Sequence, residues 1–451
     1  MKIQQFEDKG LSHFSYLIIS EADRKAVVID PARDTRPYLE AMQRYGAELA
    51  AIIETHPHAD FVSSHAELHR RTGAPILASG RIGAAYALTP YNEGERLELA
   101  EATLVCMETP GHSPDSISVL LYEGDKPTHL FSGDTLFVGD VGRPDLREKA
   151  GAISLSREDL ARMMYHTIHT RLLPLADDIV VYPAHGAGSL CGKALSADVS
   201  TTIGKERFSN PSLQPMDEDA FVRLLLADQP FVPKYFPGSV ELNRVGAPDL
   251  EAALAAIPRL TSAPDVPAHT LVIDTRAASS FKQGHLAGAI NLQQGGKFET
   301  WLGAIVAPQE PFVLVAESAS VADHLLRRAA AIGYEAQVQG VLVATAVGTI
   351  SEAPTDLAGF SADPDAYTIV DIRNRSEHAA GMMFASALAI PLPELRERLA
   401  EIPTDKPVIV HCAAGYRSAA GQSILSAALG AKTSVYDLGE AIKNYQPLVM
   451  A

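Results

Sequence analysis

The chain has 451 residues, a length that fits about three domains of ordinary size. Its residues are 47% hydrophobic and 21% charged, so each domain can bury a normal core. The formal net charge of −17 argues against nucleic acids and anionic membrane surfaces as partners, because both select basic patches. An anionic substrate would therefore have to be attracted locally, by a metal ion, an arginine or a helix N-terminus.

Cysteine usage and the first residues indicate the cellular compartment. Only Cys106, Cys191 and Cys412 are present, far apart and without a CxxC pair, so we expect no disulfide framework. The opening MKIQQFEDKG lacks the apolar segment of a secretory signal, and no apolar run approaches the length of a membrane span. These features predict a cytoplasmic protein.

Short apolar runs followed by helix-like stretches recur along the chain, which predicts an α/β multidomain protein. Four runs read as buried strands that end in polar or turn residues, at 26–31, 49–58, 129–137 and 178–186. Residues 156–173 read as a helix, with Ser156 as its N-cap and Asp159 in the first turn.

Two stretches rich in Pro, Ala and Asp, at about 245–268 and 351–366, read as linkers. The segments that follow them resemble each other: LVIDTRAASSFKQGH (271–285) pairs with TIVDIRNRSEHAAGM (368–382). This alignment places Asp274 on Asp371, Arg276 on Arg373 and Gly284 on Gly381. We therefore expect a larger domain over residues 1–250 and a duplicated module over 251–352 and 353–451.

Potential metal ligands follow four of the predicted strands. His56, His58 and Asp60 lie in THPHADF, and the later segments TPGHSPDS, FSGDTLF and VYPAHG contribute His112, Asp134 and His185. Two histidines and one carboxylate leave coordination positions open, an arrangement typical of non-haem ferrous oxygenases. Four ligand-bearing segments in this order are much stronger evidence for a metal centre than a lone HxH pair.

The order of these segments resembles the metallo-β-lactamase superfamily, whose fold is an αββα sandwich with the metal at one edge. Glyoxalase II-like members hold two metals and need a histidine where this chain has Phe61, which favours a single metal. The strings FSGDTLFVGDVGRPDL and GSLCGKALSADVSTTIGKERFSNPSL resemble the persulfide dioxygenase branch. That resemblance implies one Fe(II) per chain, held by His56, His112 and Asp134.

Several neighbouring residues have roles that the sequence leaves open. His58, Asp60 and His185 match ligand positions of two-metal relatives, or else they are hydrogen-bonding groups that orient the ligands. Arg143 is either a binding residue for an anionic persulfide carrier or one half of an ion pair. Cys191 is either a substrate-binding residue near the iron, as in relatives, or a small buried residue.

The last module contains the strand VIVHC, the turn AAGYRS and a helix over about 418–430. Backbone N–H groups of such a turn converge on the Cys412 sulfur, and the helix dipole favours its thiolate. Arg417 adds a cation for a second anion. The loop resembles that of rhodaneses, as does DIRNRSEHAAG (371–381), although Met382 replaces the usual histidine. The resemblance implies Cys412 as the nucleophile and Arg417 as the anion-binding residue.

The middle module keeps the rhodanese-like scaffold sequence DTRAASSFKQGHLAGAINL. It has Ala316 where Cys412 aligns and Val321 where Arg417 aligns. It lacks both the nucleophile and the cation, so we expect a catalytically silent pseudo-rhodanese. From end to end, the chain resembles bacterial persulfide dioxygenase–rhodanese fusions with two rhodanese-like modules.

The resemblance implies a bifunctional enzyme of sulfide detoxification. The iron domain would oxidise a persulfide of glutathione, coenzyme A or a similar thiol with O2 to sulfite, and Cys412 would make or use thiosulfate. A glyoxalase II-like thioester hydrolase with an accessory rhodanese is the alternative, and a non-catalytic persulfide sensor is a third possibility. We expect no nucleic-acid or membrane partner and a homo-oligomer, either a dimer or a tetramer.

Overall fold

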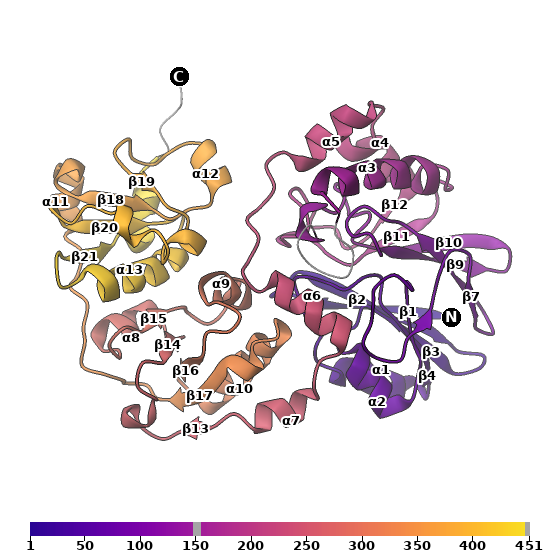
Figure 1. Ribbon diagram of the computed structural model, residues 1–451, viewed down its shortest axis with the longest axis horizontal. Coiled ribbons are helices and arrows are strands. Elements are labelled where there is room, and N and C mark those ends of the chain that lie inside the picture. The colour runs from indigo at the N-terminus through magenta and orange to yellow at the C-terminus, as the bar shows by residue number, and fades with distance from the viewer. Residues whose placement is uncertain (148–154, 447–451) are drawn as a thin grey trace. The chain divides into compact units, whose positions relative to one another are not determined.

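The computed structural model describes residues 1–147 and 155–446 (Figure 1). Its contacts divide the chain into two compact units, one of residues 1–252 with 330–333 and one of residues 253–329 with 334–451. Among the described residues, no helix combines the length and the apolar character needed to cross a membrane.

The first unit contains two six-stranded sheets. In spatial order, the first sheet consists of β1 (Lys2–Asp8), β2 (His13–Ser20), β3 (Lys25–Ile29), β4 (Glu48–Ile53), β5 (Ile76–Ala78) and β6 (Thr89–Pro90). The second consists of β12 (Thr201–Thr202), β11 (Val180–Pro183), β10 (Lys126–Gly133), β9 (Ile117–Glu123), β8 (Thr103–Glu108) and β7 (Arg96–Glu98).

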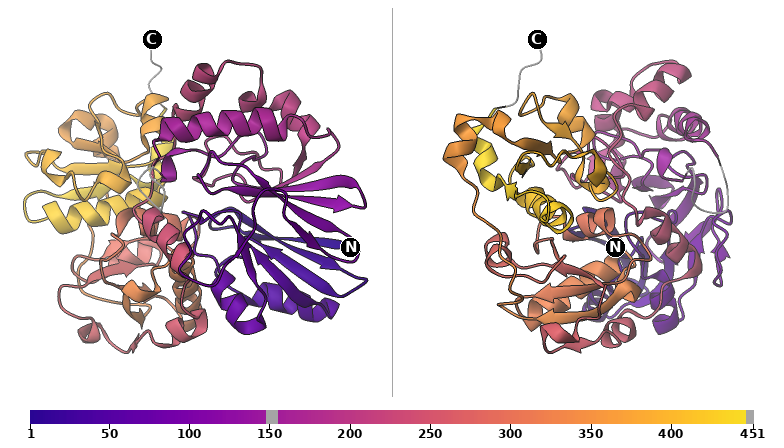
Figure 2. Two further views of the ribbon diagram at one scale, coloured as in Figure 1. Left: turned by 45° about the vertical axis from the view of Figure 1, so that its right-hand side comes forward. Right: turned by 60° about the vertical axis from the view of Figure 1, so that its left-hand side comes forward.

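Seven helices accompany these sheets within the described residues: α1 (Arg36–Tyr45), α2 (His65–Thr72), α3 (Arg157–Thr167), α4 (Ile203–Ser209), α5 (Glu218–Leu226), α6 (Phe236–Val245) and α7 (Leu250–Ala255). The left view of Figure 2 shows the two sheets face to face, with α1 and α2 outside the first sheet and α3 outside the second.

The alternation of side chains along β2 explains the four layers, because successive residues of a strand point to opposite faces. Phe14, Tyr16 and Ile18 join the core between the two sheets, whereas Leu17 and Ile19 pack under α1 and α2. A third apolar cluster, which includes Leu130, Met164 and Phe221, joins the second sheet to α3 and α5. The predicted αββα sandwich is therefore confirmed.

The second unit contains two parallel sheets. The first has the order β13 (Arg259–Leu260), β17 (Val338–Val343), β16 (Phe312–Ala316), β14 (Leu271–Asp274) and β15 (Ile290–Asn291). The second has the order β19 (Leu388–Ala389), β18 (Thr368–Asp371), β20 (Val408–His411) and β21 (Val435–Asp437). The helices of this unit are α8 (Ala278–Gln283), α9 (Phe298–Ile305), α10 (Ala319–Ala331), α11 (Leu357–Ala362), α12 (Arg375–Ala379) and α13 (Tyr416–Leu429).

The two modules of this unit repeat the same buried ion pair. The Arg276 guanidinium lies 2.6 Å from the Asp274 carboxylate and donates to the Gly284 carbonyl at 2.8 Å. In the second copy, Arg373 lies 2.6 Å from Asp371 and donates to the carbonyl of Gly381 at 2.9 Å. Each pair joins the end of an inner strand, β14 or β18, to a glycine that follows the next helix, so both copies share this structural contact.

The predicted linkers are in part regular structure. The first contains α7 and β13, and the second contains α11. The runs LEAALA and LAGFSA are short and bordered by proline or aspartate, which made them look like connections, but each contains good helix formers. The last five residues of the predicted third domain lie outside the described residues.

Helix α3 supports one of the candidate ligands. The Thr167 hydroxyl donates to the Pro110 carbonyl at 2.6 Å, and a Cβ added at Gly111 would lie 2.6 Å from the Met164 Cα. The loop that carries His112 therefore lies directly against this helix. The α-helix ends at Thr167, earlier than predicted, and the chain continues as a π-helix over Ile168–Leu172.

The predicted N-cap of α3 is present as a capping box, in which the Ser156 hydroxyl accepts from the Asp159 N–H at 3.1 Å. We predict that Ser156→Ala destabilises α3 by about 1 kcal/mol, because it leaves that N–H without its acceptor. Hydrogen exchange at the first amides of the helix should accelerate. Ser156→Thr retains the hydroxyl and should exchange like the wild type; unchanged exchange in Ser156→Ala would contradict the role of the cap.

Candidate metal centre and sulfur-transfer loop

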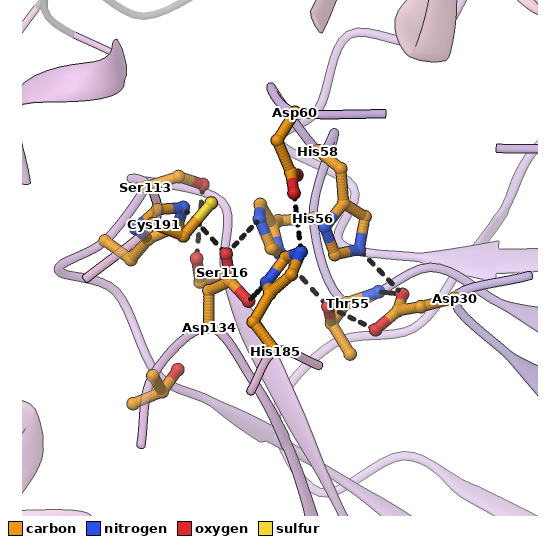
Figure 3. Close-up of polar contacts among 12 residues, drawn as sticks. Asp30, Thr55, His56, His58, Asp60, Ser113, Ser116, Asp134, His185 and Cys191 are labelled. Carbon is orange, nitrogen blue, oxygen red and sulfur yellow. Dashed lines mark hydrogen bonds and ion pairs between the residues drawn. The ribbon is translucent and has the colours of Figure 1, made fainter. Parts of the chain in front are cut away.

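Four loops at the ends of strands from both sheets carry the candidate ligands. His56 and His58 follow β4, His112 follows β8, Asp134 follows β10, and His185 follows β11. Strand β4 ends at Ile53, so the two histidines of THPHADF lie in the loop that follows the strand. All of these side chains are buried. Figure 3 shows His56 and His185 facing the Asp134 carboxylate, with His58 beside them and directed toward Asp30.

His56, His112 and Asp134 converge through one atom each. The Nε2 atoms of His56 and His112 lie 3.7 and 3.5 Å from Asp134 Oδ2. One potential ligand atom from each of the three residues lies within 4.8 Å of the others. Among the described residues, His56 Nε2 and Asp134 Oδ2 have no hydrogen-bond partner. Since buried polar atoms are costly without partners, this set fits a bound cation.

Hydrogen bonds at the other nitrogen orient both imidazoles. His112 Nδ1 donates to the Arg143 carbonyl at 2.8 Å, and His56 Nδ1 lies 3.1 Å from the Thr55 hydroxyl. The Thr55 hydroxyl donates to Asp30 at 2.8 Å and is therefore an acceptor for His56. These contacts leave each Nε2 lone pair directed toward Asp134, the usual way in which surrounding groups prepare histidine ligands.

Protonation states also suit a metal. Burial, followed by the proximity of His58, lowers the pKa of His56 well below its usual range, and burial lowers the pKa of His112. Burial alone would raise the pKa of Asp134, but His185, His112 and His56 outweigh it and lower that pKa well below its ordinary value. The set therefore offers two neutral imidazoles and one carboxylate, the forms that bind metals.

His185 bridges two carboxylates. Its Nδ1 bonds to Asp134 Oδ1 at 2.6 Å, and its Nε2 lies 2.7 Å from Asp60 Oδ2. Burial lowers the pKa of His185, but Asp134 and Asp60 raise it to about 10 overall. Both ring nitrogens are thus engaged by carboxylates, so His185 fixes Asp134 and Asp60.

A second group of potential ligands converges beside the first. Single atoms of His58, Asp134 and His185 also lie within 4.8 Å of one another. His58 Nε2 is 3.3 Å from Asp30 Oδ1. The buried Phe61 ring lies beside this group, with its centroid 4.4 Å from that of His58 and 6.4 Å from that of His185. An apolar ring therefore packs against this second group of imidazoles.

His13 is a residue of this site that the sequence did not reveal. It begins β2, its ring lies 3.8 Å from that of Phe61, and it forms a β-bridge with His185. Burial lowers the pKa of His13 well below its usual range, so its imidazole is neutral. No motif surrounds His13, and only the approach of β2 to the His185 loop places it here.

Arg143 and Cys191 are buried next to the candidate ligands. The Arg143 guanidinium contacts Asp145 through two bonds of 2.7 Å and donates to the Leu190 carbonyl at 3.1 Å. Its side chain is 1% exposed, so binding a substrate carboxylate would require it to leave Asp145. Cys191 is also buried, near Asp60 and His185. Burial, then Asp60 and Asp134, raise the pKa of its thiol well above the usual value.

The turn after β20 brings one backbone N–H to the Cys412 sulfur. The Gly415 N–H donates to Sγ at 3.1 Å, and Gly415 has φ +99°, which strongly favours glycine. Helix α13 begins at Tyr416, two residues before the predicted start. Arg417 pairs with Glu377 through bonds of 2.6 and 2.8 Å. Burial lowers the pKa of Arg417, but Glu377 and the Cys412 sulfur raise it overall.

Strand register places Ala316 at the position of Cys412. Asp371 pairs with His411 in the last module, and Asp274 pairs with Val315 in the middle one. The next residues along the two strands are Cys412 and Ala316. The middle module thus keeps the strand and the following helix α10 but has a methyl group in place of the thiol.

Two family models match separate parts of the chain. Residues 8–185 match the metallo-beta-lactamase superfamily, and residues 259–341 and 353–446 match rhodanese-like domains. A solved structure of a metallo-beta-lactamase from Staphylococcus aureus is 29% identical, with a TM-score of 0.67 over 76% of this chain and 99% of that one.

Curated relatives of the first domain have two different activities in their names. Human mitochondrial persulfide dioxygenase is 26% identical over 223 residues, which are 49% of this chain and 79% of the human one. A hydroxyacylglutathione hydrolase from Haemophilus influenzae is 29% identical over 217 residues, 44% of this chain and 91% of that one. The chain is thus a fusion of a metallo-beta-lactamase domain, homologous to persulfide dioxygenases, with two rhodanese-like domains that follow it.

Proposed function

We propose that the chain is a cytoplasmic, bifunctional sulfur enzyme. The first domain oxidises the persulfide of a small thiol such as glutathione or coenzyme A, and the last domain transfers sulfane sulfur through Cys412. The observation that carries the proposal is the three-residue set His56, His112 and Asp134, together with Phe61 against the neighbouring His58. The set offers ligands for one metal, Phe61 adds no further ligand, and the persulfide dioxygenase homology favours iron.

The oxidation consumes RSSH, O2 and water and yields RSH, sulfite and two protons, so the outer sulfur is oxidised and O2 is reduced. A ferrous ion, when bound, supplies the open coordination positions and the redox chemistry of this reaction. Asp134 Oδ2 and the Nε2 atoms of His56 and His112 would hold it. His185 keeps the other oxygen of Asp134 engaged, so the carboxylate presents one oxygen to the metal.

Sulfur transfer needs a nucleophile and an anion-binding group. In the direction that consumes thiosulfate, the Cys412 sulfur attacks the outer sulfur, the S–S bond of thiosulfate breaks, and its electron pair leaves with sulfite. The Gly415 N–H, 3.1 Å from Sγ, stabilises negative charge on the sulfur. Arg417 binds the donor anion. The reverse direction joins Cys412-bound sulfur to sulfite.

Thioester hydrolysis is the second candidate function. The hydrolase relative is as similar in sequence as the dioxygenase, and His58, Asp134 and His185 also converge. A hydrolase of this type uses two metals, so metal stoichiometry and O2 uptake distinguish the two candidates.

We predict one iron per purified chain and O2 uptake when a glutathione persulfide is added. His112→Ala removes one of three ligands and should abolish both, while cyanide-dependent sulfur transfer from thiosulfate persists at Cys412. His166→Ala, which replaces an exposed histidine of the same domain, is the matched control and should keep its iron. Two tightly bound zinc ions together with thioester hydrolysis would establish the hydrolase instead.

Phe61→His should add a second metal position. The new imidazole would lie next to His58 and near His185, the group that already converges on Asp134. Native mass spectrometry after reconstitution with Zn2+ should show one ion in the wild type and up to two in Phe61→His. Phe61→Leu keeps the position apolar and should stay at one. A single ion in all three proteins would show that residue 61 does not limit the stoichiometry.

Cys412→Ser should abolish sulfur transfer without affecting persulfide oxidation, because it removes the nucleophile and leaves all iron ligands in place. If Cys412 hands sulfur to sulfite, wild-type enzyme fed persulfide and O2 accumulates thiosulfate, whereas the variant accumulates sulfite. Product ratios are compared with an enzyme-free control, since sulfite also reacts spontaneously with persulfides. Near wild-type transfer in the variant would mean that another thiol acts, and an unchanged ratio would mean that the two reactions are not coupled.

A further inference from the structure

The silent middle module contacts the sulfur-transfer loop directly. The Tyr416 hydroxyl, within that loop, donates to the carbonyl of Gln293 at 2.8 Å and lies 3.2 Å from that of Gly295. Two turns further along α13, Ser423 Oγ accepts from the Asn291 N–H at 2.9 Å. Both carbonyls and this N–H belong to β15 and the segment after it, so the module without a thiol supports the helix that follows Cys412.

Trp301, the single tryptophan of the chain, extends this contact to the anion-binding residue. It lies on α9 of the middle module, and the Arg417 Cζ is 5.7 Å from the centroid of its ring. A guanidinium over an indole face is attracted by the ring quadrupole, most strongly when both are shielded from water. The Arg417 side chain is 13% exposed and Trp301 is partly buried, so the guanidinium is largely shielded from water.

Arg417 is therefore restrained by two modules. Glu377 of its own module engages both terminal nitrogens, at 2.6 and 2.8 Å, and Trp301 of the neighbouring module lies against the guanidinium. A carboxylate alone would allow the guanidinium to pivot with the flexible Glu377 side chain. Such a motion would also break the contact between the guanidinium and the large Trp301 indole.

We propose that Trp301 is a positioning residue of the sulfur-transfer site, which holds Arg417 where an anionic sulfur donor meets Cys412. This inference rests on the proposed sulfur transfer. It also accounts for the middle module: that module has Ala316 and Val321 at the positions of the thiol and the arginine, yet it supplies a wall of its neighbour's site. Trp301 acts through Arg417, so its removal weakens anion binding more than it slows the transfer step.

The test uses the full chain with Trp301→Ala and the conservative Trp301→Phe. For cyanide-dependent turnover, Trp301→Ala should raise the KM for thiosulfate about five- to tenfold, with kcat changed less than about twofold. Trp301→Phe keeps an aromatic face and should recover part of the loss. Tyr334→Phe is the matched control: it deletes a buried hydrogen bond of 2.9 Å to Val306 in the same module, away from the loop, and should leave KM unchanged.

A second readout does not depend on turnover. The rates at which iodoacetate and iodoacetamide alkylate Cys412, followed by peptide mass spectrometry, compare an anionic with a neutral reagent of similar size. Trp301→Ala should lower the iodoacetate-to-iodoacetamide ratio toward that of Arg417→Ala, and Tyr334→Phe should not. A lowered ratio in a chain without sulfurtransferase activity would refute the proposed function but support the positioning role. The inference would be overturned if Trp301→Ala kept the wild-type alkylation ratio and the wild-type KM. It would also be overturned if Trp301→Ala and Tyr334→Phe lost kcat equally.

Discussion

The architecture of the first domain depends on one buried carboxylate that serves two sets of partners. Asp134 directs Oδ1 to His185 at 2.6 Å and leaves Oδ2 facing His56 and His112. A buried charge is tolerated only when compensated, and His185 provides part of that compensation because Asp60 holds its other side. Loops from both sheets must end within a few ångströms of this carboxylate, which is why the ligands are spread over four widely separated segments of the chain.

The fold class and the convergence of His56, His112 and Asp134 were predictable from the sequence, whereas the groups that orient these side chains were not. Motifs at strand ends point to these three residues because a metal site requires particular side chains. The Arg143 carbonyl that orients His112 is a backbone group, which any residue could supply. His13 comes from a strand far away in the chain and has no motif. Short helices such as LEAALA were missed because proline-rich surroundings hid their helix propensity.

The duplicated modules show that scaffold and chemistry vary independently in this fold. The Asp–Arg pair at the end of the central strand is the same in both copies, down to the glycine carbonyl that accepts from the arginine. The residue that follows the strand partner of this aspartate differs between the copies. It is Cys412, with a thiol, in the last module and Ala316, with a methyl group, in the middle module. The same buried pair is therefore present whichever residue the loop carries.

Gly142 shows how a residue without a side chain can constrain a candidate metal centre. A Cβ at this position would collide with the Asp134 carbonyl oxygen and lie 2.9 Å from the His112 Cβ, so any larger residue must displace two of the three converging residues at once. A homologue that preserves every histidine and aspartate but carries a bulkier residue here would have lost the geometry while keeping the motif. Genome surveys that sort intact from decayed copies of this domain should therefore score the glycine together with the ligands.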